Sequence, residues 1–184
     1  MRSAFVPLLG LVAMTLVGCE TATPNSASNQ VGLRNDAQTA VRQMTAQDGK
    51  LQDFINNAYA YAVFPDIGEG SVGVGGASGK GVVYQNGQVV GTAALNQVSV
   101  GPQIGGQTYS ELVVFQNQDA FNRFQNGNLE FGAQATGIAV KAGAAAASRF
   151  DNGVAVFIMP KGGLQAGANI NGQKLTYSPN NSGM

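Results

Sequence analysis

The chain carries few side chains that could perform catalysis. It has no histidine and one cysteine, Cys19. Zinc sites and mechanisms that pair a serine or a cysteine with histidine therefore lack their essential groups. Asp66 and Glu69 could bind calcium or exchange protons, but a turn-forming aspartate and a solvated glutamate explain the pair more simply. We expect a protein that is not an enzyme and that uses no metal or cofactor.

Two glycine-containing segments look like nucleotide sites but have the wrong context. Residues 68–73 fit Gly-x-Gly-x-x-Gly, yet the chain continues as an alternating strand and not as the helix that binds a pyrophosphate. Gly79-Lys80 is followed by Gly81 and lacks the first glycine of a Walker loop. With 10 basic and 10 acidic residues, the chain also has no basic field that would attract nucleic acid. We expect no nucleotide or nucleic-acid binding.

The only thiol stands at the end of an N-terminal leader. Arg2 gives a basic start, residues 4–17 form an apolar run too short to span a bilayer, and Gly18 is small. Leu16-Val17-Gly18-Cys19 resembles the lipobox of bacterial lipoproteins, which implies that Cys19 is acylated with fatty acids such as palmitate and becomes the first residue. An ordinary buried or free thiol is the alternative. Because acyl chains contribute about 0.8 kcal/mol per buried methylene, the anchor would be permanent.

The residue after the cysteine bears on location. In Gram-negative lipoproteins an aspartate at this position usually means retention in the inner membrane. Glu20 stands there instead, so the resemblance to this sorting rule implies the periplasmic face of the outer membrane. Once Cys19 is acylated, no thiol remains for a disulfide in that oxidising compartment.

The sequence predicts one folded domain behind a tether. The expected organisation is a signal peptide over residues 1–18, a flexible tether over 19–32, a single domain over 33–178 and a flexible tail over 179–184. The residues of the tether are mostly small and polar, and they show no apolar periodicity. Loss of the leader removes Arg2 and leaves 9 basic against 10 acidic residues, a net charge of about −1.

Two short amphipathic helices are predicted to follow the tether. Asn35 and Gln38 are spaced like a capping pair, and apolar residues follow at helical spacing as far as Met44. After the break at Asp48-Gly49 the same spacing returns over residues 51–58. We expect this pair to pack on the domain's own sheet. Contact with lipid is the alternative, because amphipathic helices also lie on membranes.

Beyond Tyr59 the apolar residues tend to alternate with other residues, which is the spacing typical of strands. Asn86-Gly87 predicts a type I′ hairpin between residues 82–85 and 88–90, and Asn171-Gly172 repeats that design. Residues 118–125 are predicted to form a helix that is capped by Asn117 and ends at Asn126-Gly127. Further strands are expected over residues 61–64, 71–77, 98–104, 110–115, 129–140 with interruptions, and 154–159.

Glycines determine the expected shape of the sheet. Between Gly68 and Gly81 they leave little side-chain volume while the valines still alternate, which indicates close backbone approach, bulges or sharp curvature. We therefore predict an α+β fold. Its sheet is strongly curved or partly closed, mainly antiparallel and glycine-rich, with two N-terminal amphipathic helices and one mid-domain helix.

Several segments that are rich in glycine, alanine, valine or aromatic residues follow one another along the chain: Tyr61-Ala62-Val63-Phe64-Pro65, residues 72–82, 100–107, 112–115, 131–133, 144–146 and 161–164, and Gly167. In this order they resemble the successive signatures of the SYLF domain family, over roughly Leu51 to Tyr177. The family associates with lipid: eukaryotic members bind phosphoinositide membranes, and some fungal members bind actin filaments. A bacterial lipoprotein meets neither ligand in the periplasm, so the resemblance implies phospholipid recognition in general. The alanine run over 143–150 departs from the family pattern and puts any ligand contact there in doubt.

Four basic residues are candidate contacts for a lipid phosphate. Lys80 stands between two glycines and Lys161 between a proline and a glycine, so each ammonium could reach a phosphate beside exposed backbone N–H groups. Both match basic positions of the family pattern. Lys141 and Arg149 flank the small-residue stretch and could add attraction. Solvated surface cations are the alternative for all four.

The expected function is phospholipid binding without catalysis, by a periplasmic lipoprotein whose partner is the membrane. The alternative is an envelope protein-interaction or scaffolding module without lipid specificity. An apolar groove that ends at Lys80 or Lys161 would favour lipid, whereas exposed apolar surface flanked by polar residues would favour a protein partner.

Overall fold

The computed structural model describes residues 27–127, 129, 131, 137–161, 170 and 172–180, with the backbone alone at Ala27 and over 70–74 and 99–107. The predicted signal peptide, Cys19 and Glu20 lie outside these residues. Within the described part, no helix is long and apolar enough to cross a membrane. The elements in chain order are α1 (Ala27–Gln47), α2 (Leu51–Asn56), β1 (Ala60–Gln85), β2 (Gln88–Phe115), α3 (Gln118–Gln125), β3 (Ile138–Ala139), α4 (Ala144–Ala147), β4 (Val154–Lys161) and β5 (Gln173–Pro179).

The fold is built on one long antiparallel hairpin. β1 pairs with β2 from Ala60↔Phe115 to Gln85↔Gln88. Its turn is Asn86-Gly87, with φ of 51° and 75°, which confirms the predicted type I′ hairpin. The separate strands expected on either side of this turn are therefore parts of two continuous strands. Pro65 lies inside β1 at a register shift, where its carbonyl accepts a hydrogen bond of 2.6 Å from Ser110 Oγ.

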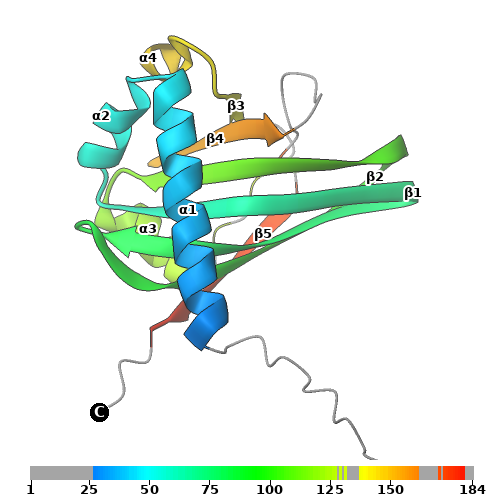
Figure 1. Ribbon diagram of the computed structural model, residues 1–184, viewed down its shortest axis with the longest axis horizontal. Helices are drawn as coiled ribbons and strands as arrows, with labels where there is room; N and C mark the ends of the chain where they lie inside the picture. The colour runs from blue at the N-terminus through cyan, green and yellow to red at the C-terminus, as the bar shows by residue number, and fades with distance from the viewer. Residues whose placement is uncertain are drawn as a thin grey trace, which may run out of the picture.

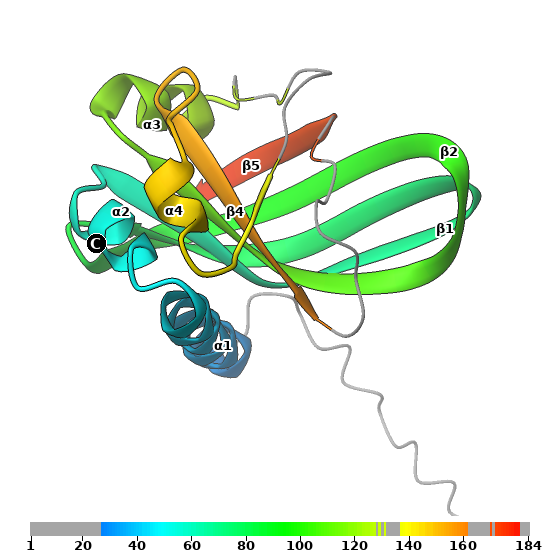
Figure 2. The same cartoon turned by 90° about the horizontal axis from the view of Figure 1, so that it is seen from above.

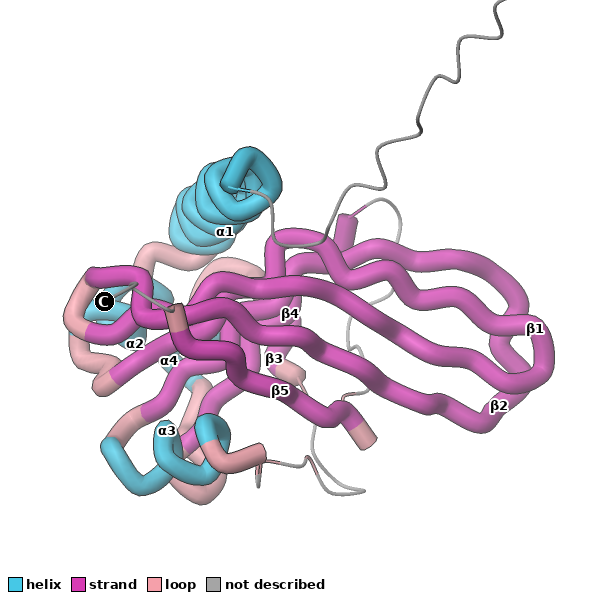
Figure 3. Tube along the Cα trace, turned by 90° about the horizontal axis from the view of Figure 1, so that it is seen from below, coloured by secondary structure: helices cyan, strands magenta, loops and turns pink. Residues whose placement is uncertain are grey.

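Two further strands divide this hairpin into halves. β4 pairs with β2 over Thr108–Phe115 and has β3 parallel on its other side, whereas β5 pairs with β2 over Gly91–Gln97. We call residues 60–68 of β1, residues 108–115 of β2, β4 and β3 the β4 half. Residues 77–85 of β1, residues 88–97 of β2 and β5 form the β5 half. Figures 2 and 3 show the hairpin doubling back between these halves.

Glycines let the two halves come close. A Cβ atom on Gly81 would lie 2.7 Å from the Val63 carbonyl oxygen and 2.7 Å from Phe64 Cδ1. One on Gly79 would lie 2.8 Å from the Asp66 carbonyl oxygen. Any larger side chain would push these β1 segments apart, so the glycines permit the sharp curvature that the sequence predicted.

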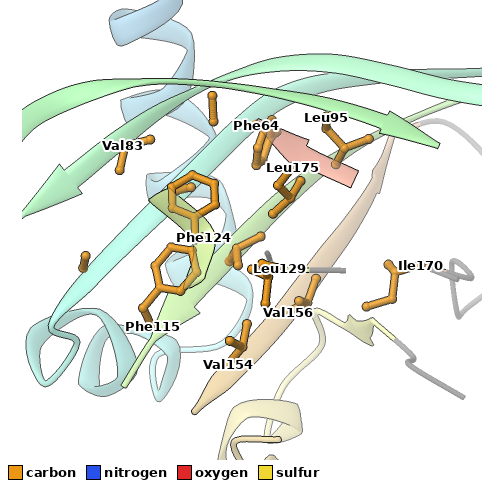
Figure 4. Packing of buried hydrophobic residues seen from close by; sticks show 14 of the residues in the cluster. Phe64, Val83, Leu95, Phe115, Phe124, Leu129, Val154, Val156, Ile170 and Leu175 are labelled. Carbon is orange, nitrogen blue, oxygen red and sulfur yellow. The ribbon is translucent and has the colours of Figure 1, made fainter. Parts of the chain in front are cut away.

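The sheet therefore has an inner and an outer face. The inner face holds a core between the two halves, to which alternate residues such as Phe64, Val83, Val113 and Leu175 contribute. Figure 4 shows Phe64 of β1, Leu95 and Phe115 of β2, Val156 of β4 and Leu175 of β5 converging in this core. The outcome is a mixed α+β fold with a mostly antiparallel sheet, as predicted. The sheet is strongly bent but it is not closed.

Helices α1, α2 and α4 cover the outer face. Ala37, Ala40 and Met44 of α1 are buried in a second core that also contains Val63 and Val82, one from each half. Figure 1 shows α1 lying across the strands of both halves, and Figure 3 shows α3 on the opposite side of the sheet. Because the small alanines let α1 lie close to the strands, this helix covers the line along which the halves meet.

Two boundaries differ from the sequence predictions. α1 begins at Ala27, so residues 27–32 are helical and do not belong to the tether. β5 continues to Pro179, and the Asn180 N–H donates to the Val90 carbonyl, so the ordered domain extends into the expected tail.

The remaining elements agree with the sequence in part. α3 spans the expected residues, and the Asn117 side chain accepts a hydrogen bond from the Ala120 N–H. Of the strands expected over 129–140, the described residues contain β3 alone, which is parallel to β4. The hairpin expected at Asn171-Gly172 falls partly outside the described residues. The alanine run contains the short helix α4, which the sequence did not predict.

Replacing Gly81 with alanine tests the close approach of the two halves. The new methyl group would overlap the Val63 carbonyl and the Phe64 ring, so we expect Gly81→Ala to lower the free energy of unfolding by about 2 kcal/mol or more. Gly68→Ala is the matched control, because nothing lies within 4 Å of its Cβ position. Urea denaturation should show no loss for Gly68→Ala. Equal stability of the two variants would contradict the proposed contact.

Candidate functional site

Lys80 lies in a hollow between α1 and the β5 half of the sheet. The hollow measures about 540 Å3. Lys80 is exposed and, within the described part of the chain, forms no ion pair. Strand alternation explains its direction: Gly79 and Gly81 face the other half, while Lys80 lies on the α1 face with Val82. The other lining residues are Ser28, Asn29, Gln30, Gly32, Leu33, Asp36, Thr92, Ala93, Ala94 and Ser178.

Lys161 lies in a second hollow, of about 350 Å3, on the same face of the sheet. Its Nζ is 2.6 Å from Asp66 Oδ1. The two side chains are 37% and 61% exposed, so water screens the pair and its contribution to stability is small. The ammonium is nevertheless partly neutralised by Asp66. The other lining residues are Asp36, Thr39, Ala40, Gln43 and Pro65.

The two hollows adjoin each other along α1. Asp36 lines both, so the structure brings Lys80 and Lys161, far apart in the sequence, to neighbouring positions beside one helix. An ammonium group in each hollow can donate hydrogen bonds to an anionic group such as a phosphate. Of the two, Lys80 is the better placed, because Lys161 already contacts a carboxylate.

Lys141 and Arg149 do not join this pair. Both are exposed and flank α4. α4 is tied to the far end of α1, because Asp48 Oδ2 accepts a 2.7 Å hydrogen bond from the Ala145 N–H. α1 has 21 residues, which corresponds to about 30 Å. Since the Lys80 hollow lies at its first turns, the predicted set of four cations separates into two groups.

Four polar side chains, which sequence reasoning missed, meet on the inner face. Gln97 and Gln173 come from paired strands of the β5 half, and Tyr109 and Glu111 come from β2 in the β4 half. Gln173 Nε2 lies 3.1 Å from Glu111 Oε2, 3.4 Å from the Tyr109 hydroxyl and 3.5 Å from Gln97 Oε1. All four are buried. We call this group the inner polar cluster.

Burial dominates the electrostatics of this cluster. Desolvation raises the pKa of Glu111 to about 8, and the hydrogen bond from Gln173 lowers it by a smaller amount. The pKa of Tyr109 is raised well above its usual range by burial and by the nearby Glu111 and Glu69 carboxyl groups. Glu111 is therefore protonated in the folded protein at neutral pH. Among the described residues, no three His, Cys, Asp or Glu side chains gather as metal ligands.

A sequence signal for this cluster exists. Glu111 has the same strand parity as Val113 and Phe115, so alternation places it on the inner face. A glutamate among strand positions that face the core is unusual, because charged groups are rarely buried without a partner. Gln173 has the parity of Leu175 in the same way.

Replacing Glu111 with glutamine tests its protonation. The folded-state pKa of about 8 lies above the ordinary value of 4.5. The folded protein therefore binds more protons than the unfolded chain between these values. In that window stability falls as pH rises, by at most about 1.4 kcal/mol per pH unit.

Glu111→Gln removes this dependence. As pH rises from about 5 to 8, the free energy of unfolding of the variant should increase relative to that of the wild type. Urea denaturation at several pH values measures this difference. Asp53→Asn, which neutralises an exposed carboxylate, should leave the slope unchanged. A stability difference between Glu111→Gln and the wild type that is the same at every pH would contradict the assignment.

Comparison with known proteins supports the resemblance seen in the sequence. Residues 96–181 match the family model described as Las17-binding protein actin regulator, Ysc84, which is the SYLF domain. The match includes most of β2, β4, β5 and Lys161, whereas the earlier segments, with Lys80, precede it. No curated protein matches the chain. The match therefore assigns residues 96–181 to the SYLF family.

Proposed function

We propose that this domain binds phospholipid through the two hollows beside α1, with Lys80 as the principal contact for the phosphate group. The observation that carries the proposal is the convergence of Lys80 and Lys161 beside one helix. Lys80 is exposed, has no ion pair within the described residues and stands at the wall of the larger hollow. A cation in such a position attracts an anionic head group without having to break an existing pair.

The lining of the Lys80 hollow suits an amphiphile. Leu33, Ala93 and Ala94 offer apolar contacts, while Asn29 and Gln30 offer amide groups. Ligand sites commonly combine apolar walls with a few polar groups that fix orientation. Binding is proposed without bond cleavage, because the chain lacks histidine and its thiol is assigned to acylation.

The second part of the proposal is that acylated Cys19 holds the domain at the periplasmic face of the outer membrane. Cys19 and Ala27 are eight residues apart, a span of at most about 29 Å when extended. The Lys80 hollow is lined by Ser28 and the following turns of α1. The anchor would therefore keep this hollow, and not the α4 end of the domain, close to the membrane.

A protein-binding module is the second candidate. It is favoured by the family description, which names binding to a protein, and by the exposed apolar side chain of Val31 at 56% on α1. In this alternative an envelope protein, and not lipid, would lie against α1. The two candidates differ in their response to lipid composition.

Lys80→Gln tests the phosphate contact. The protein is prepared without residues 1–18 and with Cys19→Ser, so that acyl chains do not contribute. One lysine near an anionic surface contributes about 1 kcal/mol, so we expect roughly fivefold weaker binding to vesicles that contain anionic phospholipid. Cosedimentation with vesicles measures the affinity.

Lys50→Gln is the matched control for net charge. Lys50 precedes α2 at the far end of α1 and is 68% exposed, and its replacement should change the affinity much less than Lys80→Gln does. Equal effects of the two variants would reject the Lys80 hollow and leave only a general charge effect. Failure of the unaltered protein to bind any lipid composition would reject lipid binding and favour the protein partner.

Cys19→Ser in the full chain tests the anchor. Without a thiol to acylate, the protein should move from the outer-membrane fraction to the soluble fraction of the cell envelope, because the acyl chains supply the anchoring free energy. Fractionation and mass spectrometry of the N-terminal peptide measure this. A wild-type protein with an unmodified thiol in the soluble fraction would overturn the lipoprotein assignment.

A further inference from the structure

Asp36 lies where the two hollows beside α1 meet. It lines both of them, and its side chain is exposed. Asn29 and Leu33 come before it at helical spacing and line the larger hollow. Gln43 follows it two turns later and lines the smaller hollow. One side of α1 therefore borders both hollows, and a carboxylate stands in the middle of that side.

Among the described residues, four charged side chains line the two hollows, and two of them neutralise each other. Lys161 and Asp66 form the ion pair of 2.6 Å. Lys80 and Asp36 both line the larger hollow, but neither belongs to an ion pair within the described part of the chain. The larger hollow therefore presents one positive and one negative group, and a ligand can reach both.

This pair of separate charges suits a zwitterionic head group better than a purely anionic one. The Lys80 ammonium attracts a phosphate, whereas the Asp36 carboxylate repels negative charge and attracts a cation. A head group that carries a phosphate and an ammonium group could contact both residues at once. The hollow, at about 540 Å3, has the volume of a small-molecule site.

The lining favours a primary ammonium group over a quaternary one. Aromatic rings are the usual binding groups for quaternary ammonium ligands, and no aromatic side chain is among the described residues that line either hollow. A primary ammonium has N–H groups, which donate short, charge-assisted hydrogen bonds to a carboxylate. Ethanolamine phospholipid carries such a group, and choline phospholipid does not.

We propose that Asp36 is a specificity-determining residue, which binds the ammonium group of an ethanolamine phospholipid while Lys80 binds its phosphate. The inference rests on the proposed function, because it needs the phosphate to lie at Lys80. It adds the class of head group and the residue that selects it. Asp36 also disfavours lipids whose head group bears only negative charge, such as phosphatidylglycerol.

Asp36→Asn is tested on three kinds of vesicle, with the protein prepared as for Lys80→Gln. The vesicles contain choline phospholipid alone, or mixed with ethanolamine phospholipid or with phosphatidylglycerol. The unaltered protein should bind the ethanolamine mixture about threefold more tightly than choline phospholipid alone, which is the effect of one exposed ion pair. Asp36→Asn should lose this preference and should bind the phosphatidylglycerol mixture more tightly than the unaltered protein does. Loss of folding would weaken binding to both mixtures.

Asp151→Asn is the matched control for net charge. Asp151 is exposed and precedes β4, at the end of that strand opposite to Lys161, so this variant should keep the preference for ethanolamine phospholipid. Soluble glycerophosphoethanolamine should compete with the vesicles better than glycerophosphocholine does, because it carries the head group without a membrane.

Two results separate the inference from the proposed function. An unchanged preference for ethanolamine phospholipid in Asp36→Asn, as expected if this lipid acts through membrane packing, would overturn the role of Asp36. Weaker binding of Lys80→Gln would in that case still support the phosphate contact. Failure of the unaltered protein to bind all three kinds of vesicle would reject the proposed function and this inference together.

Discussion

The close approach of the two segments of β1 is the contact on which the rest of the structure depends. Gly79 and Gly81 bring one half of the hairpin against the backbone of Asp66 and Val63 in the other. Only with this contact do the inner faces enclose one core and the outer faces form one surface for α1. The same segment positions Lys80, because alternation turns the residue between two inward glycines outward, toward the helix. The segment Gly79-Lys80-Gly81 therefore permits the curvature of the sheet and also places Lys80 at the candidate site.

Short-range chemistry could be predicted from the sequence, and long-range pairing could not. Asn86-Gly87 and Asn117 specify their turn and helix cap through their own backbone and side chain, so both were found where expected. The continuity of β1 through Pro65 was missed because the proline and the glycines look like strand ends. They are tolerated because β2 supplies a partner along nearly the whole length, with register shifts where the pairing is interrupted.

The packing of α1 was predicted from the sequence, whereas the inner polar cluster was missed. Ala37, Ala40 and Met44 recur at helical spacing, and all three are buried against the sheet as expected. Glu111 and Gln173 look like surface residues when each strand is considered by itself. They become buried only because the hairpin doubles back, and that curvature depends on glycines elsewhere in β1. The contacts that bury the cluster therefore join residues far apart in the chain.

The two faces of the sheet differ in what they offer a ligand. The outer face places Lys80 and Lys161 beside α1, where an anionic group would meet ammonium donors. The inner face holds the Glu111 carboxyl group and the Gln173 amide in a low-dielectric interior, where they hydrogen-bond to each other. Because the sheet separates the two faces, a phosphate beside α1 would not contact this buried cluster.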